Sequence, residues 1–455
     1  MPTSNSIAII GGGITGATAA QTLSKYDNLT IHVFDQGRRG VGGRTSSRSA
    51  ATGDGDGDSK NATMRWDHGC QFFRADTPQF QEIVKEWMTK EFVKEWNGNF
   101  ISSATLSSDR EFFGMPSTPP FFVGVDGMQS IAQNILDDAN KSLLESSSTT
   151  KSSLQVFTGT RVAQLERDSQ RWKIHGTSGT AAFHDTSEKI VQKNNGTQLL
   201  GEESGYDAII LTDVSSSFGK WHRASAGVPE QFASQVRGRV GARVPLFAAM
   251  IAFDRESKIP FDAASFDDPT VWFAAKSNSK PGMEDGPIEC WTIVSTPEYA
   301  MSKIEETPMQ DPKTGDFIPQ SPDYLTSVPG PDLCNAFKSL VCQKNGVLVE
   351  NALDTLPNVI HMDAQRWGSA MPCHRHLKND SPTQKVISGV PYDSGRFPLA
   401  PTKEERLDGK SFLVDDNLML FQAGDMMSTY TPGLEGAALS GSDAAEYLHS
   451  KFHTS

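Results

Sequence analysis

The sequence predicts an α/β protein in which a Rossmann-type parallel sheet is joined to a part with antiparallel strands. Residues 6–10 form an apolar run that ends in glycines, 14–24 carry small and apolar side chains at helical spacing, and 29–34 form a second apolar run. A strand, a helix and a strand within about 30 residues make a βαβ unit, whose strands are parallel. The runs 161–167 and 171–175 predict a hairpin, which requires antiparallel strands.

Other elements follow from further apolar runs. We expect strands at 206–211, 244–254 and 289–295, a helix at 331–342, and a helix rich in small residues from Gly436 to about Ser450. Four polar stretches lack any such period and are predicted to be flexible surface insertions: 49–63, 142–153, 177–204 and 301–327.

Composition limits the kind of partner. The chain has 455 residues, which predicts two to three domains or one large two-domain enzyme, and a formal net charge of −13. That charge argues against a nucleic-acid or anionic-membrane partner, since both attract a basic surface. The longest apolar run, 246–253, has the length of a buried strand and is far shorter than the roughly 20 residues that a bilayer requires.

The compartment is expected to be reducing. The five cysteines are odd in number, are widely spaced and form no CxxC pair, so free thiols are the simplest interpretation. The first residues lack the charged segment of a signal peptide. We therefore expect a cytoplasmic protein, with an organelle left open.

The segment Gly11–Gly16 (GGGITG) fits the dinucleotide fingerprint GxGxxG between a predicted strand and a predicted helix. Gly11 permits the tight turn, Gly13 allows the backbone to approach a pyrophosphate, and Gly16 allows close packing of helix and strand. The free N–H groups at the helix start attract phosphate. Asp35, 19 residues beyond Gly16, ends the second strand and can accept hydrogen bonds from ribose hydroxyls. The alternative is a purely structural glycine turn.

Two further segments favour FAD over NAD. Residues 38–44 (RRGVGGR) place backbone N–H groups and the Arg44 guanidinium near the same pyrophosphate, although a solvated basic loop is the alternative. Near the other end, 420–425 (LFQAGD) and 432–438 (PGLEGAA) predict a strand, a turn carrying Asp425, and a helix that begins among glycines. Asp425 can meet the ribityl chain and the helix start can face the flavin. A structural helix packed through its small residues is the alternative.

These segments resemble the FAD-dependent amine oxidase superfamily. Within it, 66–80 (WDHGCQFFRADTPQF), 122–128 (FVGVDGM) and 365–367 (QRW) are similar to the renalase-like branch. The resemblance implies a discontinuous FAD-binding domain, in which a parallel sheet is joined by a hairpin or meander, and an inserted α+β substrate domain with a mixed or antiparallel sheet. The FAD-binding domain would comprise 1–75, 124–212 and 408–455, and the substrate domain 76–123 and 213–407.

The resemblance also implies that Val162 contacts the adenine through its backbone. Some relatives attach the flavin through a cysteine beside the ring; segment 424–433 has none, so we expect non-covalent FAD. The candidate cofactor-binding residues are Gly11, Gly13, Ile14, Thr15, Gly16, Asp35, Gln36, Gly43, Arg44, Val162, Gly424, Asp425, Gly433, Glu435, Gly436 and Ala437.

The substrate pocket has five candidate residues, and none is assigned an acid–base role, because hydride transfer to a flavin requires mainly positioning and exclusion of water. Phe72, Trp367 and Tyr430 can contact a planar substrate, although ordinary core packing is the alternative for the first two. Arg366 can pair with an anion or bind backbone carbonyls, and Gln71 can offer its amide to a carboxamide. No metal-binding motif is predicted, and the pair His374 and His376 beside Cys373 is interpreted as part of a loop.

Three functions are open. The resemblance implies an oxidase that takes hydride from isomeric dihydro-NAD(P), a planar and anionic donor, and reduces O2 to hydrogen peroxide. A flavin amine oxidase or desaturase of another branch is the second reading, although a desaturase should show a membrane-facing apolar patch. A non-catalytic FAD-binding scaffold is the third.

Overall fold

The structure of this protein is a computed structural model. The residues it describes are 4–51, 63–102, 120–148, 151–168, 170–178, 197–218, 227–241, 243–283, 286–309, 318, 320–344, 347–348, 356–372 and 409–454.

A six-stranded sheet forms the first half of the molecule. Its order is β20-β21-β12-β1-β2-β8, and all neighbours are parallel except β20 and β21. The strands are β1 (Asn5–Ile10), β2 (Leu29–Phe34), β8 (Ser153–Phe157), β12 (Ala208–Leu211), β20 (Leu413–Asp415) and β21 (Leu420–Gln422). Ile7 and Ile9 belong to the core on one face and Ala8 to the core on the other, as the alternation of a strand requires.

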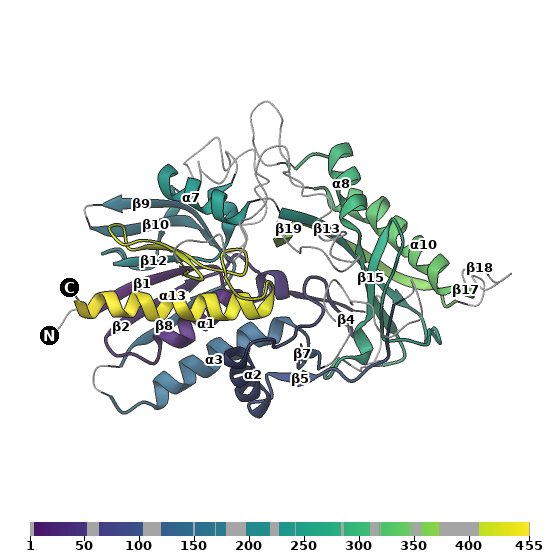
Figure 1. Ribbon diagram of the computed structural model, residues 1–455, viewed down its shortest axis with the longest axis horizontal. Coiled ribbons are helices and arrows are strands. Elements are labelled where there is room, and N and C mark those ends of the chain that lie inside the picture. The colour runs from purple at the N-terminus through teal and green to yellow at the C-terminus, as the bar shows by residue number, and fades with distance from the viewer. Residues whose placement is uncertain are drawn as a thin grey trace, which may run out of the picture.

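Helices cover one face of this sheet and a small antiparallel sheet packs with α7 on the other. The first layer contains α1 (Ile14–Leu23), α3 (Gln129–Glu145) and α13 (Leu434–Thr454). The other contains β9 (Thr160–Asp168), β10 (Arg171–Ser178), β11 (Gln198–Leu200) and α7 (Glu230–Val240). Helices α1 and α13, from opposite ends of the chain, lie side by side (Figure 1).

A second six-stranded sheet, of order β19-β13-β16-β15-β14-β6, forms the other half. Its strands are β6 (Phe100–Ser102), β13 (Arg243–Phe253), β14 (Ala263–Ser265), β15 (Val271–Lys276), β16 (Glu289–Ser295) and β19 (Val359–Pro372). All its pairings are antiparallel except that of β6 with β14. Helices α8 (Pro297–Glu306) and α10 (Pro329–Val341) share a core with this sheet, and α9 (Pro322–Ser327) lies beside β19.

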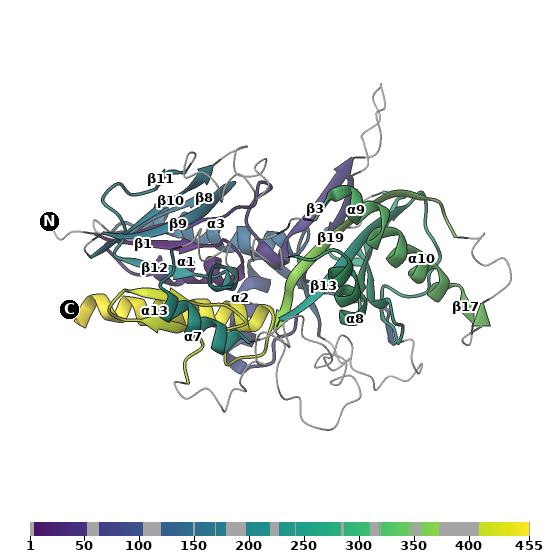
Figure 2. The same cartoon turned by 90° about the horizontal axis from the view of Figure 1, so that it is seen from above.

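Short elements lie between or beside the halves; the view from above shows one of them, β3, next to the second half (Figure 2). They are the hairpin β3 (Ser47–Ala51) and β4 (Thr63–Asp67), helix α2 (Pro78–Thr89), and the pair β5 (Val93–Glu95) and β7 (Phe122–Gly124). The 3₁₀ turns are η1 (Gly43–Thr45), η2 (Val214–Ser217) and η3 (Ser277–Ser279), and β17 (Gln343–Lys344) pairs with β18 (Val347–Leu348).

The predicted fold class is confirmed: a parallel Rossmann-like sheet is combined with antiparallel sheets. The predicted strand at 29–34 matches β2 and the predicted strand at 289–295 matches β16. The hairpin is β9 and β10, and the buried run 246–253 lies within β13.

Two of the four ranges predicted to be flexible insertions contain parts of helices. The range 301–327 was expected to be a loop, but α8 extends to Glu306 and α9 occupies 322–327. In the same way α3 extends to Glu145, inside 142–153. β3 and β4 border 49–63, and β10 and β11 border 177–204; residues 52–62 and 179–196 themselves lie outside the described residues.

The strands of the first sheet all fall in the ranges predicted for one domain, and those of the second sheet all fall in the ranges predicted for the other. Two helices cross this division. Helix α2 packs into the core under α1 and α3, and α7 packs against β12 and β21, although both lie in the ranges predicted for the substrate domain. The domain boundaries stay a prediction.

Candidate functional site

Three strands of the first sheet end together. Ile10 of β1 pairs in register with Leu211 of β12, which pairs with Gln422 of β21. The segments that leave these strands are the glycine loop, Thr212, and the turn with Asp425. In an open parallel sheet the carboxyl ends of the strands are where ligands bind, so the N-terminal and C-terminal motifs meet at one edge.

Close packing explains the glycines of the fingerprint. A Cβ atom on Gly16 would lie 2.0 Å from the Gly11 carbonyl oxygen, and Gly11 has φ +108° with Thr212 Oγ1 only 2.2 Å from the position of an added Cβ. Both positions therefore require glycine. Gly13 differs, because the nearest atom to its added Cβ is the Gly42 oxygen at 3.4 Å. Because Gly13 has no side chain, no side-chain atom of this residue covers the first backbone N–H groups of α1.

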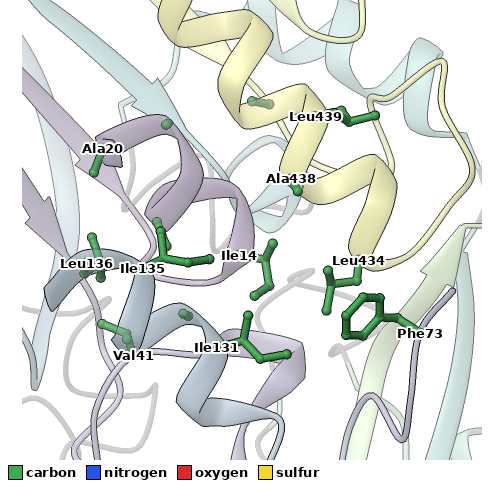
Figure 3. Close-up of a cluster of buried hydrophobic side chains, with 14 of the residues drawn as sticks. Ile14, Ala20, Val41, Phe73, Ile131, Ile135, Leu136, Leu434, Ala438 and Leu439 are labelled. Carbon is green, nitrogen blue, oxygen red and sulfur yellow. The ribbon is translucent and has the colours of Figure 1, made fainter. Parts of the chain in front are cut away.

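The starts of α1 and α13 lie against each other. Thr18 Oγ1 donates to the Ala438 oxygen over 3.0 Å, and a Cβ on Gly441 would lie 2.2 Å from the Thr15 oxygen. Figure 3 shows Ile14 of α1 and Leu434 of α13 in one apolar cluster with Phe73. No side chain caps α1 at Gly13, so its first N–H groups stay available to an anion.

Asp35 binds the backbone of two loops. Its carboxylate accepts from the Gly12 N–H and from the Gly37 N–H, each over 2.7 Å. Burial raises the pKa of this carboxyl, against the effect of those two hydrogen bonds. Each carboxylate oxygen keeps a second lone pair, so the predicted contact with a ribose remains open. Gln36 beside it is exposed.

Val162 lies in β9, which begins where the backbone N–H of Thr160 donates to the Asp35 oxygen over 2.8 Å. The residue predicted to contact an adenine is thus on the strand that starts next to the predicted ribose ligand.

Arg44 reaches the other terminus of the chain. Its guanidinium forms a two-pronged ion pair with Asp425, in which Nη1 lies 2.9 Å from Oδ2, and Nη1 also donates to the Ala370 oxygen of β19 over 3.2 Å. The Asp425 side chain is 3% exposed and that of Arg44 is 37% exposed. The arginine predicted for phosphate thus meets the acid predicted for the ribityl chain.

The remaining C-terminal candidates surround the start of α13. Gly424 has φ +132° and its N–H donates to Ser440 Oγ. Glu435 is buried; its Oε2 accepts from the N–H groups of Asp76 and Thr77, while its Oε1 has no partner among the described residues. Gly433 is exposed, Gly436 is buried and Ala437 is half-buried. A buried carboxylate oxygen without a donor is a position that a ligand N–H or O–H can satisfy.

A turn at 68–71 links Arg44 to the second sheet. The Cys70 N–H donates to the Arg44 oxygen over 2.8 Å. Trp367 Nε1 donates to the His68 oxygen over 2.7 Å, and the His68 and Trp367 rings stack with centroids 5.4 Å apart. Burial is the main cause that lowers the pKa of His68, to about 4, so this imidazole is neutral at pH 7. Trp367 therefore lies next to the predicted cofactor arginine.

A buried ion pair beneath this turn was not predicted. Lys280 Nζ lies 2.9 Å from Asp67 Oδ2, and both side chains are 0% exposed. Asp67 Oδ1 accepts from Ser47 Oγ and from the Met128 N–H. The pair joins the hairpin β3–β4 and the start of α3 to the segment after β15, and therefore holds the two halves together.

The other pocket candidates have protein partners. Gln71 Nε2 donates to the Asp67 oxygen and Lys280 Nζ donates to Gln71 Oε1, so the amide is engaged within the buried cluster. Phe72 packs against Trp96, Phe121 and Phe273. These contacts match the core-packing alternative.

Arg366 and Tyr430 are held by hydrogen bonds of their own. Arg366 Nη2 donates to the Ile318 oxygen over 3.0 Å, which fits the carbonyl-binding alternative. Tyr430 Oη donates to Asp443 Oδ2 over 3.1 Å.

The donor set around the edge suits a dinucleotide. Two helix starts, one guanidinium, one buried carboxylate oxygen without a donor, and the carboxylate of Asp35 can between them bind phosphates, hydroxyls and a ring N–H. No group of three or more metal-ligating side chains occurs in the part of the chain that the structure describes. His374 and His376 lie outside it. Within the same part, no helix is both long enough and apolar enough to cross a membrane.

The four cysteines among the described residues are free thiols: Cys70, Cys290, Cys334 and Cys342. Cys70 is the one in the turn beside Arg44. Burial raises its pKa to about 11, and its Sγ donates to the Phe72 oxygen. This thiol is therefore protonated at pH 7.

Comparison with known proteins identifies the same fold. Residues 9–87 match the family model of an NAD(P)-binding Rossmann-like domain. A protein described as a protoporphyrinogen oxidase from Exiguobacterium sp. 255-15 superposes with a TM-score of 0.52 at 11% identity, over 99% of each chain. A p-nitrophenol 4-monooxygenase from Pseudomonas putida DLL-E4 gives 0.46 at 12% identity, over 100% of this chain and 82% of that chain. The chain thus has a mixed α/β fold with a Rossmann-like domain, a fold it shares with the Exiguobacterium protein.

Proposed function

We propose that this protein is an FAD-dependent oxidoreductase that binds FAD non-covalently between the starts of α1 and α13. The observation that carries the proposal is the Arg44–Asp425 pair, because it joins a phosphate-binding and a hydroxyl-binding side chain from opposite ends of the chain at one sheet edge. An NAD site needs the N-terminal βαβ unit; the second acid and second helix start favour a larger, flavin-bearing dinucleotide.

Each part of the site has a role in this proposal. The bare start of α1 and Arg44 hold the diphosphate, Asp35 the adenosine ribose, and Asp425 the ribityl hydroxyls. The start of α13, with Glu435, faces the flavin ring. When bound, FAD supplies the N5 atom that accepts a hydride. The protein positions the donor and excludes water.

The protonated Cys70 supports non-covalent binding. A thioether link to a flavin requires a nucleophilic thiolate, and the raised pKa of Cys70 keeps its sulfur as a thiol. If the yellow colour stayed with the chain after acid denaturation, this part of the proposal would be wrong.

For the donor, we propose an isomeric dihydro-NAD(P), with O2 as acceptor and hydrogen peroxide as product. Trp367 supports a planar donor: its Nε1 is already bound to the His68 oxygen, so the indole offers only its ring surface. The neutral His68 stacked on it adds no charge that would repel or attract the donor at pH 7.

The test is anaerobic reduction of the purified, full-length holoprotein. Isomeric dihydronicotinamides and, separately, amines are added while the flavin absorbance near 450 nm is followed; O2 is then admitted and peroxide is measured. Bleaching by dihydronicotinamides with peroxide formation is the expected result. Bleaching by amines alone would favour another oxidase branch, and no bleaching by either would favour a scaffold. A colourless protein that binds no FAD would overturn the whole proposal.

A further inference from the structure

Two histidines near the end of α13 face each other across one helical turn. Nε2 of His449 lies 2.7 Å from Nε2 of His453, and the ring centroids are 4.3 Å apart. Residues at i and i+4 lie on one side of a helix. The ring of His449 is also stacked on Tyr26, which precedes β2, with centroids 3.4 Å apart and an interplanar angle of 10°. One of the two rings is therefore already held in place by the body of the protein.

The distance between the two nitrogens suits a chelate. Two neutral imidazoles at this distance form one Nε2–H···Nε2 hydrogen bond, in which the accepting Nε2 offers its lone pair. A divalent metal with bonds of about 2.0–2.1 Å to each nitrogen would hold them about 2.9 Å apart at a right angle and about 3.3 Å apart in a tetrahedron. The observed 2.7 Å is a hydrogen-bond distance, and rotation of the exposed His453 side chain would bring both nitrogens onto one ion; Cu²⁺ binds such nitrogen ligands most tightly of the divalent first-row metals.

The surroundings fit a two-ligand site at the surface. Lys451 on the same turn is paired with Asp416 over 3.1 Å. Within the described residues no third His, Cys, Asp or Glu completes a group of three, so water would fill the other positions.

We propose that His449 and His453 chelate one divalent transition metal ion, with Cu²⁺ bound most tightly and Ni²⁺ and Zn²⁺ more weakly. On binding, the proton on the donating Nε2 moves through solvent to Nδ1 of the same ring, so both rings stay neutral and each offers an Nε2 lone pair to the ion. The site is at the far end of α13 from Leu434, so this inference does not depend on the proposed flavin function. Because His449 also stacks on Tyr26, the bound ion would hold the His449 ring in its stacked position.

The experiment uses the untagged full-length protein and CuCl₂, NiCl₂, ZnCl₂ and MgCl₂. Calorimetric titration gives stoichiometry and affinity, and the electron paramagnetic resonance spectrum of Cu²⁺ reports the nitrogen ligands. We expect one Cu²⁺ held by two nitrogens, a rise in melting temperature with Ni²⁺, and no response to Mg²⁺. A ligand that binds only the native state raises its stability by mass action.

The decisive variant is His453→Ala, because His453 is exposed and its removal leaves the Tyr26–His449 stack intact. We expect it to weaken Cu²⁺ binding at least tenfold and to abolish the Ni²⁺ effect. The matched control is His374→Ala/His376→Ala, which removes two histidines that are near each other in the sequence, and it should leave both effects unchanged. Equal metal binding by wild type and His453→Ala, or loss of binding in the control alone, would overturn the proposal.

Discussion

Two buried ion pairs, Lys280–Asp67 and Arg44–Asp425, differ in how far water reaches them. Both side chains of the first are 0% exposed, and Asp67 has further donors in Ser47 and Met128. In the second, Asp425 is enclosed but the Arg44 side chain is 37% exposed.

This difference in exposure indicates that the first pair has a structural role and that the second can bind a ligand. A buried charge whose hydrogen-bond partners are all protein groups cannot also bind a ligand. Removing one member of such an ion pair leaves the other as an unpaired buried charge. A guanidinium that water can reach can exchange one anion for another at small cost. Lys280 therefore holds the two halves together, whereas Arg44 is available to a phosphate.

The largest expected effect comes from breaking the sealed pair. Lys280→Met leaves the Asp67 carboxylate buried without its cation and should lower the free energy of unfolding by about 3–5 kcal/mol, measured by urea denaturation. Lys280→Met/Asp67→Asn should recover part of this loss. If Lys280→Met were as stable as wild type, the Lys280–Asp67 pair would not be what holds the two halves together.

Next in size is a contrast between two glycines of the fingerprint. Gly16→Ala drives a Cβ to within 2.0 Å of the Gly11 oxygen and should destabilise the protein by about 3 kcal/mol even without FAD. In Gly13→Ala the nearest atom is 3.4 Å away, so the apoprotein should keep its stability while FAD binding weakens at least tenfold. Thermal melts of the apoprotein and FAD titrations distinguish the two; equal melting temperatures for both variants would contradict the packing argument.

The neutral His68 predicts a dependence on pH. Its pKa of about 4 in the fold lies below the ordinary 6.5, so the unfolded chain binds the extra proton first as the pH falls. Stability should decrease between pH 6.5 and 4, and this residue should contribute about 2 kcal/mol to the loss between pH 7 and 5. In denaturant titrations, His68→Asn should lose less stability than wild type over that pH range. Some loss should remain, because the pKa values of His32 and His361 are lowered in both proteins. An unchanged slope would mean that folding does not lower the pKa of His68.

The smallest effect on folding should come from the open pair. Asp425→Asn breaks an ion pair whose carboxylate is buried but whose arginine side chain is 37% exposed, so the apoprotein should lose about 1 kcal/mol, less than Lys280→Met loses. FAD affinity should nevertheless fall about tenfold, because the amide accepts fewer hydrogen bonds from hydroxyl groups. The matched control, Asp416→Asn, alters an exposed acid that follows β20 and pairs with Lys451 of α13, and it should leave FAD binding unchanged. If both variants bound FAD like wild type, Asp425 would not be a ligand.

The elements that were predictable are those fixed by local patterns. The βαβ unit, β13 and β16 follow from apolar runs in single segments, and the glycine positions follow from the sterics of one turn. The Lys280–Asp67 pair joins residues 213 apart and leaves no local pattern, so only the fold reveals it. Gln71 illustrates the same limit, because no local pattern shows that its side chain accepts a hydrogen bond from Lys280.

Some errors could have been avoided. Helices α8 and α9 lie in polar sequence, yet Thr296–Pro297 and Ser321–Pro322 place an N-cap side chain before a proline at the first helical position, and both caps form. Thr77–Pro78 does the same for α2, which was not predicted. An N-cap side chain followed by proline is a recognised signal for the start of a helix. A prediction based only on hydrophobic periodicity does not detect it.

The order of strands in the first sheet has a consequence for synthesis on the ribosome. β12 pairs with β1 on one side and with β21 on the other, and β21 ends at Gln422, more than 200 residues after β12. Until that late segment emerges, the newly made β12 presents an unpaired edge to its surroundings, the kind of edge on which nascent chains misassociate.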